Sequence, residues 1–74
     1  MTLAQLTLGK SGRVIRIAGS DQITARLLEM GLTPGVEVQM LGVAPLGDPI
    51  ELALRGYRLS VRRSEAQRVE IEST

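Results

Sequence analysis

Residues 29 to 35 read EMGLTPG, and this short stretch carries enough turn chemistry to decide the fold. Gly31 directly follows an apolar-periodic segment, and a glycine there can take the left-handed conformation that ends a helix. Leu32 stands where a Schellman helix ending places an apolar contact with the last helical turns. Thr33-Pro34-Gly35 then supplies the proline and glycine of a type II turn. We therefore predict that this stretch ends a helix and turns the chain directly into a strand.

Before this corner, the sequence predicts one strand and one helix. Residues 12–19, GRVIRIAG, are rich in β-branched side chains and bounded by glycines, which is typical of a strand. From Ser20 to Met30 apolar residues recur at helical spacing, and Ser20 or Asp21 is suited to cap the first free N–H groups. Three leucines lie further upstream, and we expect them to fold over the edge of the first strand as a short lid: Leu3, Leu6 and Leu8.

After the corner, the sequence predicts a series of short strands. Residues 36–40, VEVQM, alternate between apolar and polar side chains. The Leu41-Gly42 pair that follows breaks this alternation, which suggests a bulge where a small sheet bends. Residues 50–54 and 57–61 alternate in the same way, so both are predicted to be strands with one buried face.

The last third of the chain predicts a hairpin, a helical turn and a final strand. Only Arg55 and Gly56 separate the two alternating runs, which predicts a hairpin with Gly56 at positive φ and Tyr57 facing inward. A single-turn helix is expected at residues 63–67, and a short strand begins at Val69. Five short strands and one inserted helix predict a mostly β fold, a small closed or nearly closed barrel.

Length and composition indicate one domain with an aliphatic core. The chain has 74 residues, so residues 1–74 are assigned to a single domain, and its one aromatic residue is a tyrosine. It has no cysteine, which fits a reducing compartment. The first residues lack a secretory pattern, and no stretch approaches the roughly 20 apolar residues that cross a bilayer. We expect a cytoplasmic protein that does not insert into a membrane.

The sequence offers little material for catalysis or tight metal binding. It has no histidine and no cysteine, so one copy cannot assemble an ordinary zinc site, a thiol nucleophile or an imidazole base. Glu70 and Glu72 share a face of the last predicted strand, and they either are solvated or bind a hard cation weakly. No phosphate-binding glycine motif is present. We therefore predict that the chain is not an enzyme and has no catalytic, cofactor-binding or metal-binding residues.

Charge and aromatic content also limit the class of partner. The net charge of +1 is too small to steer the chain toward nucleic acid or an anionic membrane. Base stacking and the recognition of proline-rich peptides both need several aromatic side chains, and this chain has one. Charge alone names no partner.

Two groups of residues are candidates for contact with a partner. The first group is basic and lies in and after the predicted hairpin: Arg55, Arg58, Arg62 and Arg63. These arginines either form a contact patch for an acidic surface or backbone phosphates, or are solvated charges that protect exposed strand edges. The second group lies at the corner after the helix: Met30, Leu32 and Pro34. If these side chains project outward they form a small apolar knob, and the alternative for Met30 is packing in the core.

Two motifs taken together carry a family resemblance. The string RLLEMGLTPGVEV at residues 26–38, followed by PLGDPIELALRGYRLSVRR at residues 45–63, resembles the FeoA family of small ferrous-iron-transport accessory proteins. It is also similar to the SH3-like C-terminal domain of iron-dependent repressors. The resemblance implies an SH3-like β-barrel with one short inserted α-helix. It further implies a cytoplasmic protein that works with FeoB, a membrane transporter of ferrous iron that carries a cytoplasmic GTP-binding domain.

Three functions are compared on this basis. The first is a non-enzymatic module that binds the cytoplasmic GTP-binding region of FeoB and modulates its assembly or nucleotide cycle. The second is a metal-binding or metal-sensing regulatory domain that takes Fe²⁺ or another divalent ion weakly through carboxylates, which copies of the chain could share. The third is the barrel of a repressor without its DNA-binding helices, which is disfavoured because the chain begins with its own Met and has no helix-turn-helix. Self-association is left open by the sequence.

Overall fold

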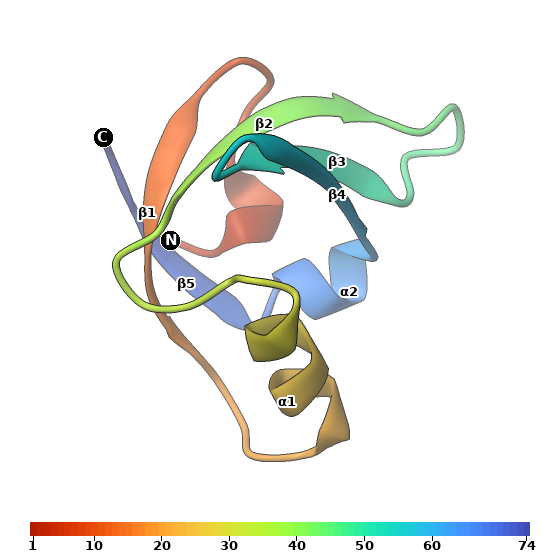
Figure 1. Cartoon of the computed structure of the whole chain (residues 1–74). Helices are drawn as coiled ribbons and strands as arrows, with labels where there is room; N and C mark the ends of the chain where they lie inside the picture. The colour runs from red at the N-terminus through yellow and green to blue at the C-terminus, as the bar shows by residue number, and fades with distance from the viewer.

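Five antiparallel strands form one bent sheet in the order β4-β3-β2-β1-β5 (Figure 1). The computed structural model describes residues 1–74. Along the chain the elements are the 3-10 helix η1 (Leu3–Gln5), β1 (Ser11–Ile17), α1 (Gln22–Glu29), β2 (Glu37–Val43), β3 (Ile50–Leu54), β4 (Tyr57–Val61), α2 (Arg63–Ala66) and β5 (Val69–Ser73). The prediction of a mostly β fold with an inserted helix is confirmed. The sheet is not closed, because its outer strands β4 and β5 pair only with β3 and β1.

The corner at EMGLTPG has the predicted geometry. Gly31 has a φ of 107°, its N–H donates to the Leu28 carbonyl at 3.0 Å, and the N–H of Leu32 donates to the Leu27 carbonyl at 3.2 Å. These two bonds define a Schellman ending for α1. Gly35 also has a positive φ, 93°, and the turn before it leads straight into β2. The corner therefore fixes how α1 is placed against the sheet.

The predicted bulge and hairpin are both confirmed. The register between β2 and β3 shifts between Met40 and Gly42, where the alternation of the sequence breaks. Arg55 and Gly56 form the two-residue turn between β3 and β4, with φ of 48° and 83°. Positive φ at both positions is the mark of a type I′ turn, so the turn places a non-glycine residue in the left-handed region as well. The sequence had indicated this conformation for Gly56 alone.

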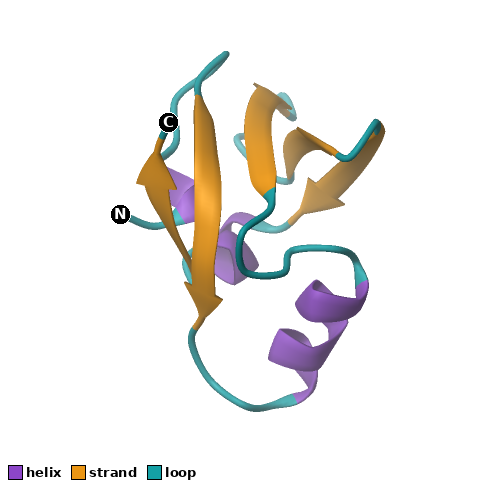
Figure 2. Ribbon diagram, turned by 60° about the vertical axis from the view of Figure 1, so that its left-hand side comes forward, coloured by secondary structure: helices purple, strands orange, loops and turns teal.

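The core is aliphatic and lies inside the bend of the sheet. In Figure 2 the strands separate into two groups, β1 with β5 and β2 with β3 and β4. Fifteen buried apolar residues form one cluster, to which α1 contributes Leu27 and the corner contributes Leu32. Leu3 and Leu6 are buried, but the prediction of a lid over the edge of β1 is wrong: η1 packs against α2 and β5, and Leu8 is 68% exposed.

Tyr57 corrects the prediction for the inner face of β4. Its side chain is 42% exposed, whereas the sequence pattern had placed it inward with Val61. The phenol instead reaches across to the end of α1, where its hydroxyl donates a hydrogen bond to the carbonyl of Met30. The first residue of β4 thus connects the hairpin to the helix. No helix in the chain has the length and apolar character needed to cross a bilayer.

Candidate interaction surface

The two candidate groups, far apart in sequence, meet at one end of the molecule. The Tyr57 hydroxyl bonds the carbonyl of Met30, and Arg55 Nη2 lies 3.4 Å from Thr33 Oγ1. The tip of the β3–β4 hairpin therefore lies against the corner that follows α1. Pro34 is exposed, and Met30 is half-buried. This proximity brings Met30, Pro34 and Arg55 into one continuous region.

Leu32 does not belong to this surface. The expectation that it projects outward is wrong, because its exposed fraction is 0% and it lies in the core cluster. The Schellman ending is the physical cause, since it turns the residue after the left-handed glycine back toward the helix. The apolar knob predicted at the corner is thus reduced to Pro34 and part of Met30.

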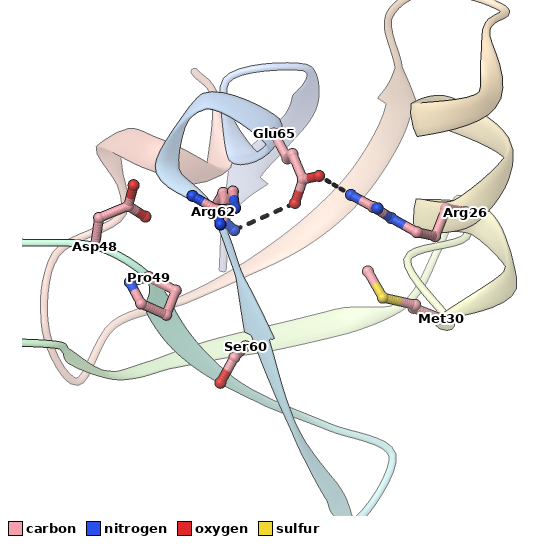
Figure 3. A pocket seen from close by; sticks show the side chains of 7 residues that line it. All are labelled: Arg26, Met30, Asp48, Pro49, Ser60, Arg62 and Glu65. Atoms are coloured by element: carbon pink, nitrogen blue, oxygen red, sulfur yellow. Dashed lines mark hydrogen bonds and ion pairs between the residues drawn. The ribbon is translucent and has the colours of Figure 1, made fainter.

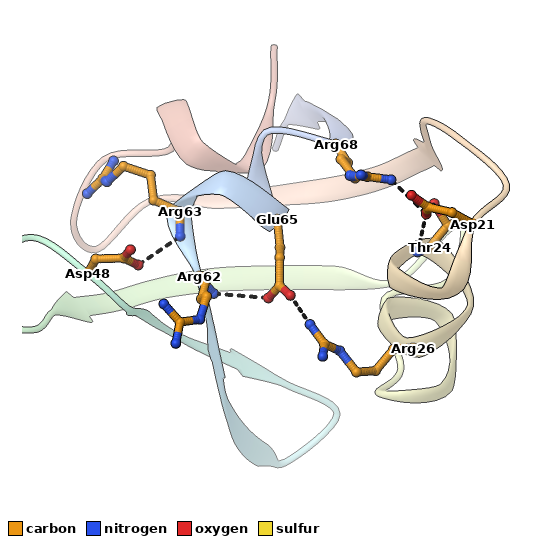
Figure 4. A network of polar contacts seen from close by, with 8 residues as sticks. All are labelled: Asp21, Thr24, Arg26, Asp48, Arg62, Arg63, Glu65 and Arg68. Atoms are coloured by element: carbon orange, nitrogen blue, oxygen red, sulfur yellow. Dashed lines mark hydrogen bonds and ion pairs between the residues drawn. The ribbon is translucent and has the colours of Figure 1, made fainter.

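Arg63 serves the fold, which corrects its place in the basic contact patch. Its backbone N–H donates to Asp48 Oδ1 at 2.8 Å, a contact drawn in Figure 4. Its guanidinium donates from Nε to the carbonyl of Gly47 at 3.2 Å and from Nη1 to the carbonyl of Ala4 at 3.2 Å. The side chain therefore joins the β2–β3 loop to η1 and is not free to contact a partner.

The other three arginines of the basic group remain available. Arg55, Arg58 and Arg62 are exposed. The four ion pairs of the chain involve other basic residues: Arg13, Arg16, Arg26 and Arg68. Solvated arginines without a carboxylate partner are free to pair with acidic groups of another molecule.

A groove of about 600 Å³ lies beside β4 (Figure 3). In this view β4 runs between Pro49 on one side and Met30 of α1 on the other, with Ser60 on the strand between them. Arg62 and Glu65 line the upper end of the groove as drawn. The groove therefore lies along the outer strand of the sheet, and Arg62 is the arginine without an ion pair that lines it.

Glu65 is the buried acidic side chain of this groove. It is 9% exposed, and it pairs with Arg26 of α1 while accepting the N–H of Arg62 through Oε1 at 3.3 Å. Glu65 thus caps the first turn of α2 and joins it to α1 (Figures 3 and 4). Sequence reasoning did not single out Glu65, although a glutamate three residues after an N-cap position, here Arg62, is a recognisable sign of a helix start.

Asp21 forms a second polar cluster at the other end of α1. Its Oδ1 accepts the backbone N–H of Thr24 at 3.2 Å and lies 2.8 Å from Arg68 Nη1 (Figure 4). The backbone hydrogen bond from Thr24 and then the hydrogen bond from Arg68 lower the pKa of this carboxyl below its ordinary value. These contacts identify Asp21 as the helix cap, which settles the choice between Ser20 and Asp21.

The acidic residues are not arranged to hold a metal ion. No three carboxylates gather in one place, and the chain has neither His nor Cys. Glu70 pairs with Arg16 at 3.3 Å, and Glu72 lies 4.0 Å from Arg13. Each carboxylate considered for weak cation binding therefore has an arginine partner within the chain.

An apolar side chain on the β2–β3 loop was missed by sequence reasoning. Leu46 is 97% exposed, and Val43 at the end of β2 is 46% exposed. The Pro-Leu-Gly turn was a signal that could have indicated this, because a residue at a turn tip has few neighbours to cover it. This loop adds an apolar contact point next to Asp48 and Pro49 of the groove.

Fold and site together define a class of protein: a small SH3-like β domain that has neither histidine nor cysteine. The chain belongs to the FeoA family, because the model of the FeoA domain matches residues 1–73. The resemblance seen in the sequence is therefore confirmed.

Three similar proteins illustrate this family. A fusion of Fe(2+) transport protein A with the Fe(2+) transporter FeoB from Porphyromonas gingivalis (strain ATCC BAA-308 / W83) is 33% identical over 97% of the chain, which spans 8% of the fusion. The solution structure of iron(II) transport protein A from Clostridium thermocellum has a TM-score of 0.94 at 35% identity, covering 100% of this chain and 46% of that one. Stenotrophomonas maltophilia FeoA, an SH3 domain protein in complex with zinc, has a TM-score of 0.84 at 36% identity, with 97% and 89% covered.

The fold also extends to metal-dependent repressors. A manganese-dependent transcriptional repressor has a TM-score of 0.91 over 100% of this chain and 36% of its own, at 21% identity. Identity this low shows a shared fold and nothing about function. The predicted structural relation to repressor domains is confirmed at that level.

Proposed function

We propose that this chain is a non-enzymatic accessory protein of ferrous iron uptake. In this proposal it acts in the cytoplasm, where it binds the GTP-binding region of the FeoB transporter and modulates its assembly or nucleotide cycle. The observation that carries the proposal is the Porphyromonas gingivalis relative, in which a protein of this family and FeoB form one polypeptide. Covalent linkage holds two domains at an effective concentration of about a millimolar or more, a benefit only if the domains act on one another.

The chemistry of the surface supports the same proposal. The chain has no thiol, no imidazole and no gathered metal ligands, which favours contact as its mode of action. Arg58 and Arg62 are exposed without ion pairs, Arg62 lines the groove, and Leu46, two residues before Asp48 of the groove, projects almost fully into solvent. Unpaired arginines around exposed apolar side chains are typical of protein interfaces.

A calorimetric titration with the GTP-binding region of FeoB tests this function. We expect binding in at least one of the GDP-bound, GTP-bound and nucleotide-free states. Arg58→Glu and Arg62→Glu should each weaken binding by about tenfold, because each reverses a charge at the contact. Lys10→Glu is the matched control, since it makes the same charge change at an exposed residue outside the groove. Absence of binding in all three states would contradict the proposal.

The apolar loop can be tested in the same assay. Leu46→Ser removes the side chain that is 97% exposed and should weaken binding without changing the free energy of unfolding, because the leucine makes almost no internal contact. Leu8→Ser is the control, since Leu8 is 68% exposed at a different place in the chain. Equal affinities for both variants and the unmodified chain would exclude the loop from the interface.

A further inference from the structure

We propose that the open edge of β4 binds an extended acidic segment of a partner protein, which joins the sheet as an additional strand. For the identity of the partner, FeoB, this inference rests on the proposed function. It adds how the partner is bound and the chemistry of the segment that is bound. β4 is an end strand of the order β4-β3-β2-β1-β5, so one of its sides has no neighbouring strand. Exposed strand edges of this kind accept peptides through main-chain hydrogen bonds.

The hairpin register determines which backbone groups of β4 face away from the sheet. Leu54 and Tyr57 flank the two-residue turn, and in such a hairpin this closing pair is hydrogen-bonded. Bonded and non-bonded pairs alternate from there, so Leu59 bonds to β3 while Arg58 and Ser60 direct their N–H and C=O groups outward. Outside the sheet ladder, no backbone hydrogen bond of the chain involves Arg58 or Ser60. Two donors and two acceptors are therefore free along this edge.

The groove beside this edge has room for a strand. A strand residue occupies roughly 160 Å³, from a rise of about 3.3 Å, a strand spacing of about 4.8 Å and a layer spacing of about 10 Å. The volume of about 600 Å³ thus corresponds to three or four extended residues. Figure 3 shows Met30 of α1 on the side of β4 away from Pro49, which directly precedes β3, so Met30 would lie next to an added strand.

The charges along the edge favour an acidic segment. Arg58 and Arg62 lie four residues apart, about 13 Å along a strand, and neither forms an ion pair. Two nearby carboxylates have internal contacts: Glu65 pairs with Arg26, and Asp48 accepts the N–H of Arg63. Glu51 lies opposite Ser60 on the side of β3, away from the open edge. A segment with acidic residues spaced by four would therefore match both arginines.

A second copy of the chain fits this edge less well than an acidic segment does. Two β4 edges laid side by side would gather two copies each of Arg58 and Arg62 along one seam. Like charges close together across paired strands are destabilising. Charge complementarity therefore selects a partner of opposite sign over self-association.

The test uses the full chain with two capped octapeptides, one alternating Val and Glu and one alternating Val and Lys. Nuclear magnetic resonance follows the amide signals and their hydrogen exchange. We expect the amides of Arg58 and Ser60 to exchange rapidly in the free chain and to shift and gain protection with the acidic peptide. The acidic peptide should bind at least about tenfold more tightly than the basic one, and the difference should shrink in high salt.

Variants at Ser60 separate a strand contact from simple charge attraction. Ser60→Pro removes an outward N–H that the ladder does not use, so the sheet should form while the acidic peptide binds at least about tenfold more weakly. Ser60→Ala keeps the N–H and should bind as the unmodified chain does. Arg58→Glu provides an independent test if the proline variant does not fold, since with Arg62 still present it brings the charge of the pair to zero and should remove the preference for the acidic peptide.

The other possible outcomes either contradict strand addition at β4 or distinguish it from binding to FeoB. Equal binding of both peptides, or signal changes confined to residues outside β4, would overturn it. Protection of the β4 amides that depends on the concentration of the chain itself would assign the edge to a second copy. If the FeoB region binds while the acidic peptide leaves β4 unchanged, only this proposal falls. If the peptide binds at β4 and the FeoB region does not bind, only the proposed function falls.

Discussion

Replacing Gly31 by alanine tests the corner on which the fold depends. At a φ of 107° an added side chain is strained by about 1–2 kcal/mol. The new Cβ would also collide with the hydroxyl of Tyr57, which bonds the carbonyl of Met30. Because the Tyr57 side chain is 42% exposed it can turn away, so the collision costs mainly that hydrogen bond, about 1 kcal/mol. We expect Gly31→Ala to lower the free energy of unfolding in urea by about 2–3 kcal/mol, and Gly31→Val to lower it further.

Two comparisons separate the backbone strain from the collision. Gly35 has a φ of 93°, but nothing lies within 4 Å of a Cβ built there, so Gly35→Ala should cost only the strain of about 1–2 kcal/mol. In a Tyr57→Phe background the hydroxyl is absent, and Gly31→Ala should cost about as much as Gly35→Ala. Equal losses at the two glycines in the unmodified chain, or strict additivity of Gly31→Ala with Tyr57→Phe, would refute this reasoning.

Three further predictions concern charge and metal. Arg63→Ala should lower the free energy of unfolding by about 1–2 kcal/mol, because it removes two hydrogen bonds from the guanidinium to carbonyl groups. The control variant Arg62→Ala should change this free energy by less than about 0.5 kcal/mol, and urea denaturation measures both. Because the pKa of Asp21 is lowered in the folded chain, its contribution to stability is present above pH 4 or so and is lost as the pH falls below that. Asp21→Asn keeps a capping oxygen and should flatten this part of the acid unfolding curve. An unchanged curve would show that Asp21 does not contribute to the pH dependence of stability. Saturating Fe²⁺ or Zn²⁺ should leave the melting temperature unchanged, since a metal at 100 times its dissociation constant would add about 2.7 kcal/mol and raise it clearly.

Local features of the fold could be predicted because few neighbouring residues determine them. The end of α1 at Gly31 and the hairpin turn at Arg55 and Gly56 follow from backbone preferences within a few positions. The bulge at Gly42 is also local, since it appears as a break in a period of two. Each of these predictions is confirmed without any knowledge of contacts across the chain.

The errors concern side chains whose surroundings come from distant parts of the chain. Arg63 looked like one more exposed arginine, but its bonds reach Gly47 and Ala4, which no local pattern connects to it. Tyr57 was placed inward by alternation, and a carbonyl on α1 instead holds its hydroxyl. The groove beside β4 depends on the packing of α1 against the hairpin, so sequence periodicity could not have indicated it.

Arg58 on β4 and Arg62 just after it have two explanations that predict different consequences of the same change. As protection of a strand edge, Arg58 and Arg62 keep copies of the chain apart. As a contact site, they attract an acidic segment. In the double variant Arg58→Ser with Arg62→Ser, the loss of edge protection should increase self-association, which sedimentation measures. The loss of a contact site should instead weaken the binding of the acidic octapeptide and reduce the salt dependence of that binding. Both effects are expected together, because the charge that repels an identical edge is the one that selects an opposite charge. Increased self-association without any loss of affinity for the acidic peptide would mean that the two arginines only protect the strand edge and do not form a contact site.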